Sequence, residues 1–530
     1  MTTTSPSAPG RLDRVLDWIE RAGNRLPEPF MLFVLLTLVV AVLSSVMAAF
    51  GVSVTIPGEN EITPVRGAFS GAGLEFFFTG LAQNFIGFPP LRTVVTIMLA
   101  VGLAERSGML NALIRLAFSR APRWLLPYAL GFIGVSGSVM ADSAFIIIPP
   151  LAAIVFKAAG RHPVAGLIGG FAAVGAGYST SLLVTSLDAL LAGITNGVAA
   201  ALPVTGTPVT PISNYFYNAV SSIVLSLLAG LIIDRVVEPG LVRSGFPDTE
   251  VEPDDDPTAT RGSDDPTAEP TSATVTPTER RGLRAAGVAL LVLVVAVLVL
   301  VLVPNSPLRN ETGGYLPASP LLDSVVTLVF LAFFVPALFY GIYAGVIRRG
   351  ADVPLLMGQA LKDLSGFIVL AFILGQFIAL FAWTNIGAWL AVSGANLLQT
   401  IGLTGYPAIL GFVVLASLLN LFIVSGSSLW TLMASVFVPM FLLLGYEPSF
   451  VQGAFRVGDA ATQVMTPLNP YMIVLLTFVR RYQPSAGLGT VIAKMVPFVV
   501  PFWVAWVLVL TAFYAFDIPM GPGVDVRIGE

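Results

Sequence analysis

The sequence predicts an all-α polytopic membrane protein, because of its composition, its long uncharged segments and the polar breaks within them. Of its 530 residues, 55% are hydrophobic and only 11% are charged, whereas soluble domains carry about 25% charged residues. Uncharged segments long enough to cross a bilayer, about 20 residues each, recur along the chain. This pattern excludes a disordered chain, an ordinary soluble enzyme and a nucleic-acid-binding protein.

Five uncharged segments are the clearest candidate spans: Pro29–Val52, Trp124–Ala141, Ala285–Val303, Ser324–Ile347 and Met495–Phe516.

A sixth run, Leu364–Tyr446, has 83 residues without a charge, the length of roughly four spans. Polar islands interrupt it, such as Trp383–Gly387 and Asn420–Ser428. Polar breaks at membrane depth are tolerated where they line a protein cavity, so we expect re-entrant hairpins and broken helices.

An acidic stretch divides the chain into two apolar halves. Asp248–Glu279 contains ten acidic residues and one arginine, so it carries −9 while the whole chain carries only −4, and the remainder carries +5. With almost no apolar side chains to bury, it predicts a disordered linker. Arginines precede the first span and flank this linker, which predicts that the N-terminus and the linker are cytoplasmic. These arginines are Arg11, Arg14, Arg21, Arg25, Arg235, Arg243, Arg280, Arg281 and Arg284.

The predicted organisation has five parts. They are a cytoplasmic amphipathic N-terminus at 1–28, a first transmembrane half at 29–240 with a hairpin near 124–156 and a helix break at Asp188, an acidic cytoplasmic linker at 241–284, a second transmembrane half at 285–516 with a hairpin around 420–445, and a C-terminal tail at 517–530.

The two halves share a short motif. Val-Ser-Gly-Ser occurs at Val135–Ser138 and again at Val424–Ser427, and each copy is followed by a proline 12 residues after its last serine, Pro150 or Pro439. Internal repeats are typical of secondary transporters, whose substrate site lies at the repeat interface near mid-membrane. We expect the two repeats to be inverted.

Four ionisable residues stand alone within apolar sequence: Asp142, Asp188, Arg456 and Asp459. A charge at the bilayer centre costs about 2.5–3.5 kcal/mol on insertion scales, so each needs a partner or a wet cavity and marks a candidate site. Structural alternatives stay open. Arg456 and Asp459 share a helix face and could neutralise each other, Asp188 could be an interfacial helix cap, and Asp142 could satisfy a helix break.

An enzymatic alternative is remote. The chain has no cysteine, which excludes thiol nucleophiles and thiolate metal sites. Its single histidine, His162, argues against a histidine-ligated metal or a Ser-His-Asp triad. A serine nucleophile at Ser138 or Ser427 would need a base such as His or Lys, and neither stands nearby in the sequence. We expect no catalytic residues and no cofactor.

Several ordered motifs resemble the AbgT family of p-aminobenzoyl-glutamate transporters. In the second half the resemblance rests on Val424–Trp430, Phe437–Phe441, Leu444–Pro448, Phe455–Asp459 and Val464–Tyr471. In the first half it rests on Leu16–Pro27, Gly102–Gly108, Ala141–Phe145 with Pro149 and Pro150, and Gly177–Ser181 through Asp188. It spans nearly the whole chain except the acidic linker.

The resemblance implies a homodimer in the bacterial inner membrane, with about nine transmembrane helices and two re-entrant helical hairpins per protomer. It implies ion-coupled transport, by H⁺ or Na⁺, of p-aminobenzoyl-glutamate and related folate catabolites. Export of sulfonamide antimetabolites by an antiporter is also implied. A carrier for another dicarboxylate or peptide-like anion is the alternative.

The resemblance also assigns site residues. The family's functional positions fall on Asp188, Ser427, Trp430, Pro448, Arg456, Asp459 and Pro467. Candidate Na⁺ ligands are Asn420, Thr466 and Asn469. From the residue chemistry we expect Arg456 to attract a substrate carboxylate, Trp430 to stack on the aromatic ring and Asp188 to couple ion movement.

The chain departs from the family at Leu429, where the family commonly has lysine, and in the length of its acidic linker. Both departures bear on substrate choice and not on the fold.

Overall fold

The computed structural model describes residues 27–55, 62–119, 121–200, 206–249, 275–316, 319–402 and 405–529. The predicted amphipathic N-terminus, with Arg11, Arg14, Arg21 and Arg25, lies outside these residues apart from 27–28. The central part of the acidic linker, 250–274, also lies outside them.

The described chain is predominantly helical, as predicted. The first half contains α2 (Pro29–Ala49), α3 (Gly71–Ile86), α4 (Pro89–Arg106), α5 (Met109–Ser119), α6 (Leu126–Val135), α7 (Ser143–Ala158), α8 (Pro163–Ala176), α9 (Ser186–Ala199), α10 (Tyr215–Ile232) and α11 (Glu238–Arg243). The second half contains α12 (Pro277–Leu302), α13 (Pro320–Asp323), α14 (Val325–Tyr343), α15 (Asp352–Asp363), α16 (Ser365–Trp383), α17 (Ile386–Thr400), α18 (Tyr406–Asn420), α19 (Gly426–Leu443), α20 (Pro448–Ala461), α21 (Pro470–Arg480) and α22 (Leu488–Ala515). One short antiparallel pair, β1 (Ser53–Thr55) and β2 (Ile62–Pro64), aligns Val54 with Thr63.

Local sequence explains where many helices begin. Proline stands in the first turn of α4, α8, α18, α20 and α21, where its missing N–H costs no helical hydrogen bond. Helix α12 begins with a capping box, in which the Thr276 and Glu279 side chains bond each other's backbone N–H.

Helices α11 and α12 correct the predicted linker. Residues 241–243 belong to α11, and residues 277–284, including Arg280, Arg281 and Arg284, belong to α12. The cap at Thr276 and the proline at Pro277 extend the helix beyond the apolar segment, because helix formation here depends on the cap and not on hydrophobicity.

Eight helical segments of the described chain are long and apolar enough to span a bilayer, against about nine expected. They are Pro29–Ala49, Gly71–Arg106, Tyr215–Arg243, Pro277–Leu302, Val325–Tyr343, Ser365–Trp383, Gly426–Leu443 and Leu488–Ala515. Other apolar helices, such as α6, α8 and α18, are only 10–17 residues long. The predicted span Trp124–Ala141 is one of these shorter cases: helix α6 ends at Val135 and a 3₁₀ turn follows at Ser136–Met140.

The short helices follow the same order in each half. In the first half, α6 leads into α7 and then into α8 and α9, which are separated by a break at 177–185. In the second half, α18 leads into α19 and then into α20 and α21, which are separated by a break at 462–469. The Val-Ser-Gly-Ser motifs lie at the α6–α7 turn and the α18–α19 turn, and both following helices contain proline. The internal repeat, its inverted orientation and the re-entrant hairpins remain predictions.

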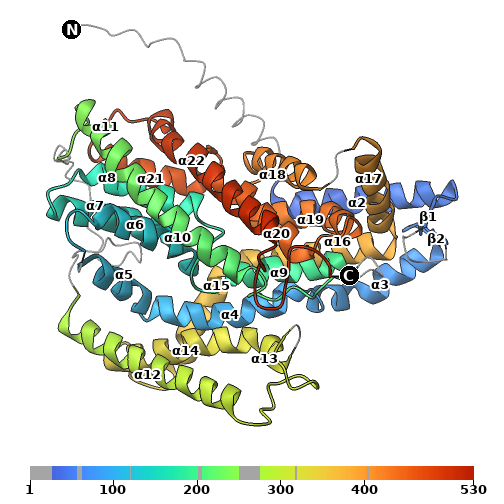
Figure 1. The fold of residues 1–530 in the computed structure, drawn as a ribbon, viewed down its shortest axis with the longest axis horizontal. Coiled ribbons are helices and arrows are strands. Elements are labelled where there is room, and N and C mark those ends of the chain that lie inside the picture. Colours follow the sequence, from blue (N-terminus) through green and yellow to red (C-terminus); the bar gives the residue numbers. More distant parts are fainter. Residues whose placement is uncertain are drawn as a thin grey trace, which may run out of the picture.

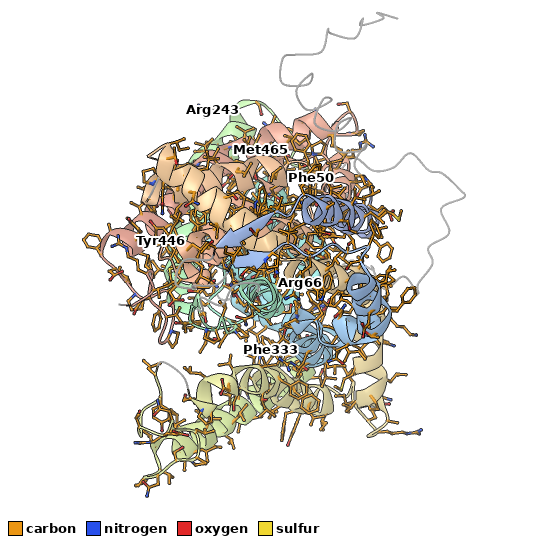
Figure 2. All side chains as sticks on the ribbon, turned by 90° about the vertical axis from the view of Figure 1, so that its right-hand side faces the viewer. Phe50, Arg66, Arg243, Phe333, Tyr446 and Met465 are labelled. Atoms are coloured by element: carbon orange, nitrogen blue, oxygen red, sulfur yellow. The ribbon has the colours of Figure 1, made fainter. Side chains whose placement is uncertain are left out.

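Figure 1 shows helix α9 near the middle of the molecule, with α10 and α22 crossing in front of the core. Helices α12 and α14 pack on each other along one edge. In Figure 2 this pair forms a lobe beside the main body. Of the eight candidate spans in the described chain, helix α12 is the least buried, with 11% of the residues in its apolar segment buried. This is expected for a helix that faces lipid or another chain.

The most deeply buried helices are α8 and α20, in which every residue is buried. Helix α20 approaches α18 closely at Gly458, where an added Cβ would lie 2.4 Å from the Cβ of Ala416. Small residues allow such close helix contacts in membrane proteins. Unlike α8, α20 carries charged side chains, Arg456 and Asp459, into this core.

Candidate functional site

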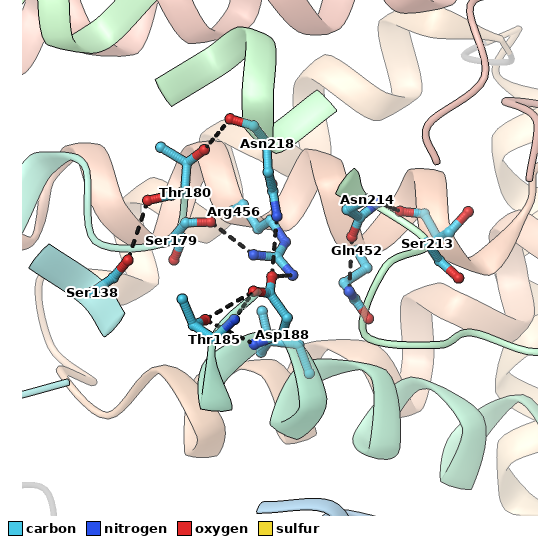
Figure 3. A network of polar contacts seen from close by, with 12 residues as sticks. Ser138, Ser179, Thr180, Thr185, Asp188, Ser213, Asn214, Asn218, Gln452 and Arg456 are labelled. Carbon is cyan, nitrogen blue, oxygen red and sulfur yellow. Dashed lines mark hydrogen bonds and ion pairs between the residues drawn. The ribbon is translucent and has the colours of Figure 1, made fainter. Parts of the chain in front are cut away.

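The candidate site begins at Asp188, in the first turn of α9. Asp188 and Thr185 form a capping box: the Asp188 N–H donates to Thr185 Oγ1 at 3.3 Å, and the Thr185 N–H and hydroxyl both donate to Asp188 Oδ2 at 2.8 Å. Asn218 of α10 donates to the other carboxylate oxygen at 3.0 Å (Figure 3). The interfacial cap considered for Asp188 is therefore partly right: Asp188 caps its helix, and it does so in the protein interior, where its side chain is 5% exposed.

Arg456 of α20 faces this carboxylate from the second half of the chain. Its Nη2 lies 2.8 Å from Asp188 Oδ1, and its Nη1 donates to the carbonyl of Ser179 at 2.7 Å (Figure 3). The Arg456 side chain is 1% exposed, yet its Nε and Nη2 lack a partner with hydrogen-bond geometry. The close Nη2 contact is thus an ion pair without an aligned hydrogen bond, and the guanidinium has unused donor capacity.

Asp459 lies one turn after Arg456 on the same helix and interacts with different groups. Ser179 donates its hydroxyl hydrogen to Asp459 Oδ2 at 3.0 Å. Within the described chain, the ion pair of Arg456 is with Asp188 and not with Asp459. The alternative in which Arg456 and Asp459 neutralise each other is therefore wrong.

The Asp459 carboxylate also lies against the start of α19. A Cβ added to Gly426 would sit 3.2 Å from Oδ2 and 3.3 Å from Oδ1, so glycine leaves the space that the carboxylate occupies. The first turn of a helix carries unpaired N–H groups and the positive end of the helix dipole, which favour an anion. At this end of α19, Ser425 Oγ accepts from the Ser428 N–H at 3.4 Å, and the partly buried Ser427 has its Oγ 3.2 Å from Ser425 Oγ.

Trp430 lies one turn farther along α19 and is fully buried. Its indole N–H points to Leu191 O at 3.3 Å and Thr195 Oγ1 at 3.1 Å, both on α9. Its ring lies on Phe455, with centroids 4.6 Å apart. In this conformation the ring therefore packs within the protein, and no face of it is open to a ligand.

A second group of polar side chains continues from Thr195. Its hydroxyl donates to Gln452 Oε1 at 2.6 Å. Gln452 in turn donates to Asn214 Oδ1 at 2.8 Å (Figure 3). Gln452, Arg456 and Asp459 are spaced four and three residues apart, so one face of α20 carries all three polar groups.

The other predicted residues lie at the edges of this site. Pro448 starts α20, and Pro467 lies in the break between α20 and α21. Asn420, at the end of α18, donates to the main-chain carbonyl of Asp459 and to Thr462 Oγ1. Thr466 donates to Leu421 O at 2.8 Å, and Asn469 caps α21.

The described chain contains no cluster of three or more His, Cys, Asp or Glu side chains that could hold a metal. Asn420, Thr466 and Asn469 make the hydrogen bonds given above, and their role as Na⁺ ligands stays a prediction. Leu429, at the position of the family's lysine, is fully buried.

Sequence reasoning missed Ser179, Thr185, Asn218 and Gln452. Two of them had a signal: Thr185 starts a Thr-x-x-Asp capping pattern, and Gln452 continues the polar face of Arg456 and Asp459. Ser179 lies in the polar Gly177–Ser181 segment, but nothing in that segment indicates which side chain faces the site. Asn218 stands in an apolar helix without a distinguishing pattern.

Comparisons with known proteins agree on one family. Residues 14–528 match the AbgT putative transporter family. The p-aminobenzoyl-glutamate transport protein of Escherichia coli K12 is 38% identical over 529 residues, covering 100% of both chains.

Two solved structures are also similar. The YdaH transporter of Alcanivorax borkumensis has a TM-score of 0.85 and 34% identity, over 94% of this chain and 100% of that one. MtrF of Neisseria gonorrhoeae, described within a class of antimetabolite efflux pumps, has a TM-score of 0.85 and 34% identity, over 96% and 100%.

Proposed function

Because the chain belongs to the AbgT putative transporter family, we propose that it transports p-aminobenzoyl-glutamate or related folate catabolites, coupled to H⁺ or Na⁺. The chain is a multi-span membrane transporter, and the hydrolase alternative is set aside because the family and the relatives are transporters. The substrate proposal rests on the name of the E. coli relative and on the chemistry of the site. Export of sulfonamide antimetabolites is the related activity suggested by the description of MtrF.

The observation that carries this proposal is the unsatisfied guanidinium of Arg456. Nε and Nη2 are buried without hydrogen-bond partners, and an unsatisfied buried donor costs about 1–3 kcal/mol. A carboxylate of the substrate can accept from both nitrogens at once, in the bidentate geometry that arginine favours. Glutamate-bearing compounds supply such a carboxylate.

Coupling would arise from competition for Arg456. A substrate carboxylate that binds the guanidinium weakens its attraction for Asp188, which then needs another positive partner because a lone buried charge is costly. A proton or Na⁺ supplied from one side of the membrane would meet that need. Asp188 is the proposed coupling residue for this reason.

The aromatic ring of the substrate would be recognised at α19. Trp430 offers a large ring and Ser427 a hydroxyl near the helix start, but the Trp430 ring is packed on Phe455 in this conformation. Stacking on a substrate therefore requires the start of α19 to move away from α20, as alternating access to a buried site demands. Pro448, at the start of α20, and Pro467, in the break between α20 and α21, mark the places where the chain would bend in this movement, because proline cannot continue a helix from the preceding residues.

We place the protein in the bacterial inner membrane, with a cytoplasmic N-terminus and linker, as a homodimer. The orientation rests on the arginines beside the first span and the linker. The homodimer rests on the resemblance alone. The direction of transport depends on the gradients and on which conformation is more populated.

A carrier for another dicarboxylate or a peptide-like anion is the second candidate function. It is favoured by Leu429, a buried apolar side chain next to Trp430 where the family commonly has lysine. Without that cation, a second substrate carboxylate would have fewer positive partners, and selectivity could move toward a different anion.

The test is flux by purified protein in liposomes with an imposed H⁺ or Na⁺ gradient. We expect gradient-dependent uptake of p-aminobenzoyl-glutamate, with the substrate recovered intact, and a sulfonamide is measured beside it. Arg456→Lys keeps the positive charge but removes the planar pair of donors, so its KM for the substrate should rise. Flux equal to that of protein-free liposomes under every gradient contradicts the proposal, and stronger competition by an unrelated dicarboxylate favours the second candidate.

A further inference from the structure

The charged residue Asp142 takes no part in the Asp188–Arg456 ion pair and lies at the α6–α7 turn (Ser136–Ser143). Asp142 is the only charged residue between Arg123 and Lys157. The residue before it, Ala141, has φ of +47°, a backbone conformation that is rare for any residue with a Cβ. Such strain persists only where surrounding contacts hold it in place.

Asp142 does not perform the ordinary task of its position. It stands at the N-cap of α7, where an aspartate side chain normally accepts a helix N–H, but it makes no such bond. Its carboxylate instead accepts a hydrogen bond from the Tyr178 hydroxyl at 3.1 Å. Tyr471, on α21, reaches the same cluster through its ring contact with Phe145.

Three aromatic rings reinforce this contact. Phe145, on the first turn of α7, lies between Tyr178 and Tyr471, with centroid distances of 5.7 Å and 5.0 Å and interplanar angles of 25° and 3°. The stack joins α7, the break between α8 and α9, and α21. The α6–α7 turn is thus attached to both halves of the chain at one place.

Tyr178 connects this stack to the candidate site through its neighbour in the chain. Ser179 donates to Asp459 and accepts from Arg456. Thr180 accepts at its carbonyl from Ser138 Oγ, at 3.3 Å, and donates from its hydroxyl to Asn218 O at 2.7 Å. The segment Tyr178–Thr180 is therefore held by the α6–α7 turn on one side and by site residues on the other. Figure 3 shows the contacts of Ser179 with Arg456 and of Thr180 with Ser138 and Asn218.

We propose that Asp142 is a positioning residue of the transporter, which holds Tyr178 and thereby fixes Ser179 against Arg456 and Asp459. Release of the Asp142–Tyr178 bond frees the Tyr178–Thr180 segment and loosens both contacts of Ser179 together. The inference rests on the proposed function in one respect, namely that the Arg456 site binds the substrate. The placement of the segment itself can be tested without any substrate.

The natural absence of cysteine makes the test direct. Ser181→Cys places one thiol beside the segment, at a side chain that is 3% exposed, and its reaction with a maleimide reports how far the segment opens. In this background Tyr178→Phe keeps the stacked ring and removes only the hydroxyl, and Asp142→Ala removes the acceptor. Tyr406→Phe is the matched control, because it also removes a tyrosine hydrogen bond, to Thr511 at 2.7 Å, from a partly buried site on α18.

We expect Tyr178→Phe and Asp142→Ala each to speed labelling severalfold, because Asp142 is exposed and the lost hydrogen bond is therefore of ordinary strength. The double variant should label no faster than either single variant, because both remove the same interaction. In liposomes both single variants should raise KM for p-aminobenzoyl-glutamate more than they lower kcat. Tyr406→Phe should change neither quantity.

Wild-type labelling rates in both single variants, or additive rates in the double variant, overturn the proposal. An increase in labelling rate in Tyr406→Phe equal to that in the two single variants also overturns the proposal, because that result means a general loosening of the protein. If the wild-type protein carries no p-aminobenzoyl-glutamate but the labelling results hold, the proposed function fails and the positioning role stands.

Discussion

Neutralising one residue of the Asp188–Arg456 ion pair should lower the free energy of unfolding more than neutralising both residues together. The two groups are 2.8 Å apart, and their side chains are 5% and 1% exposed. A single neutralisation leaves the other charge buried without compensation, at about 3–5 kcal/mol. Asp188→Asn and Arg456→Gln are the two single changes, and their combination closes a double-mutant cycle.

The contacts of Asp188 set the size of the effect. Its carboxylate accepts from the Thr185 N–H, the Thr185 hydroxyl and the Asn218 amide, at 2.8–3.0 Å. An asparagine must turn its NH₂ group toward one of these donors, which leaves a buried donor unsatisfied at about 1–3 kcal/mol. We therefore expect Asp188→Asn to lower the free energy of unfolding by about 3–5 kcal/mol, and the double variant to lose clearly less than the sum of the singles.

The assay is chemical unfolding in mixed micelles together with liposome flux. Arg235→Gln is the control, because its contact with Asp234 at 3.3 Å is largely exposed, with 75% of the arginine side chain accessible. Such exposed pairs are worth about 0–1 kcal/mol. The double variant should regain stability without regaining flux, because no guanidinium remains to bind a carboxylate. Single variants within about 1 kcal/mol of wild type, with an additive double variant, would refute the reasoning about the buried pair. Wild-type flux by Asp188→Asn under every gradient would refute its coupling role.

Three further results are expected. Gly426→Ala should reduce flux severalfold, because its Cβ would lie 3.2–3.3 Å from the Asp459 carboxylate oxygens. The control Gly411→Ala, whose Cβ would have nothing within 4 Å, should leave flux unchanged, and equal effects of the two variants would contradict the close approach. Trp430→Phe keeps a ring on α19 but removes the indole N–H bonds to α9, so the free energy of unfolding should fall by about 1 kcal/mol. Trp430→Ala should also impair substrate binding, and unchanged substrate affinity and transport rate in this variant would exclude stacking. Asp352 lies outside the candidate spans, and hydrogen bonds from the Arg349 and Arg348 backbone N–H groups hold its pKa below the ordinary 3.8. Its contribution to the free energy of unfolding, relative to Asp352→Asn, should be full above pH 3.8 and should fade as the pH falls through the lower pKa of the folded state. Unfolding at a series of pH values measures this contribution.

The fold class followed from the sequence because the bilayer imposes a simple rule. Long uncharged segments must be helices there, since no other open structure satisfies its backbone groups in lipid. The rule does not say where an apolar segment breaks. Trp124–Ala141 reads as one span, yet the helix stops at Val135, where Ser136 and Gly137, which have a low helix preference, follow. Helix α12 shows the reverse case, because its cap at Thr276 extends it into a polar region that composition assigns to a linker.

The charged residues of the site were predictable because a charge within an apolar membrane segment is costly and therefore rare. Asp188, Arg456 and Asp459 stood out as charges within apolar sequence, and they lie within one buried network. Their pairing was not predictable, because Arg456 has Asp459 three residues away in sequence but meets Asp188 from a distant helix. Spacing along a helix describes neighbours on one surface, whereas tertiary packing decides which surface a buried charge faces.

The arrangement of charges suggests why the proposed transport would be ion-coupled. The site holds two buried carboxylates, Asp188 and Asp459, but only one guanidinium, which is ion-paired with Asp188. The Asp459 carboxylate rests at the start of α19 beside Gly426, where the helix dipole favours an anion. A substrate carboxylate bound to Arg456 would bring three carboxylates against one guanidinium in a water-poor interior. Each unpaired charge there costs several kcal/mol, so the loaded site is favourable only if a cation enters with the substrate or a carboxylate takes up a proton. Coupling in this mechanism follows from charge balance, and the coupling ion is whichever cation the freed carboxylate can reach.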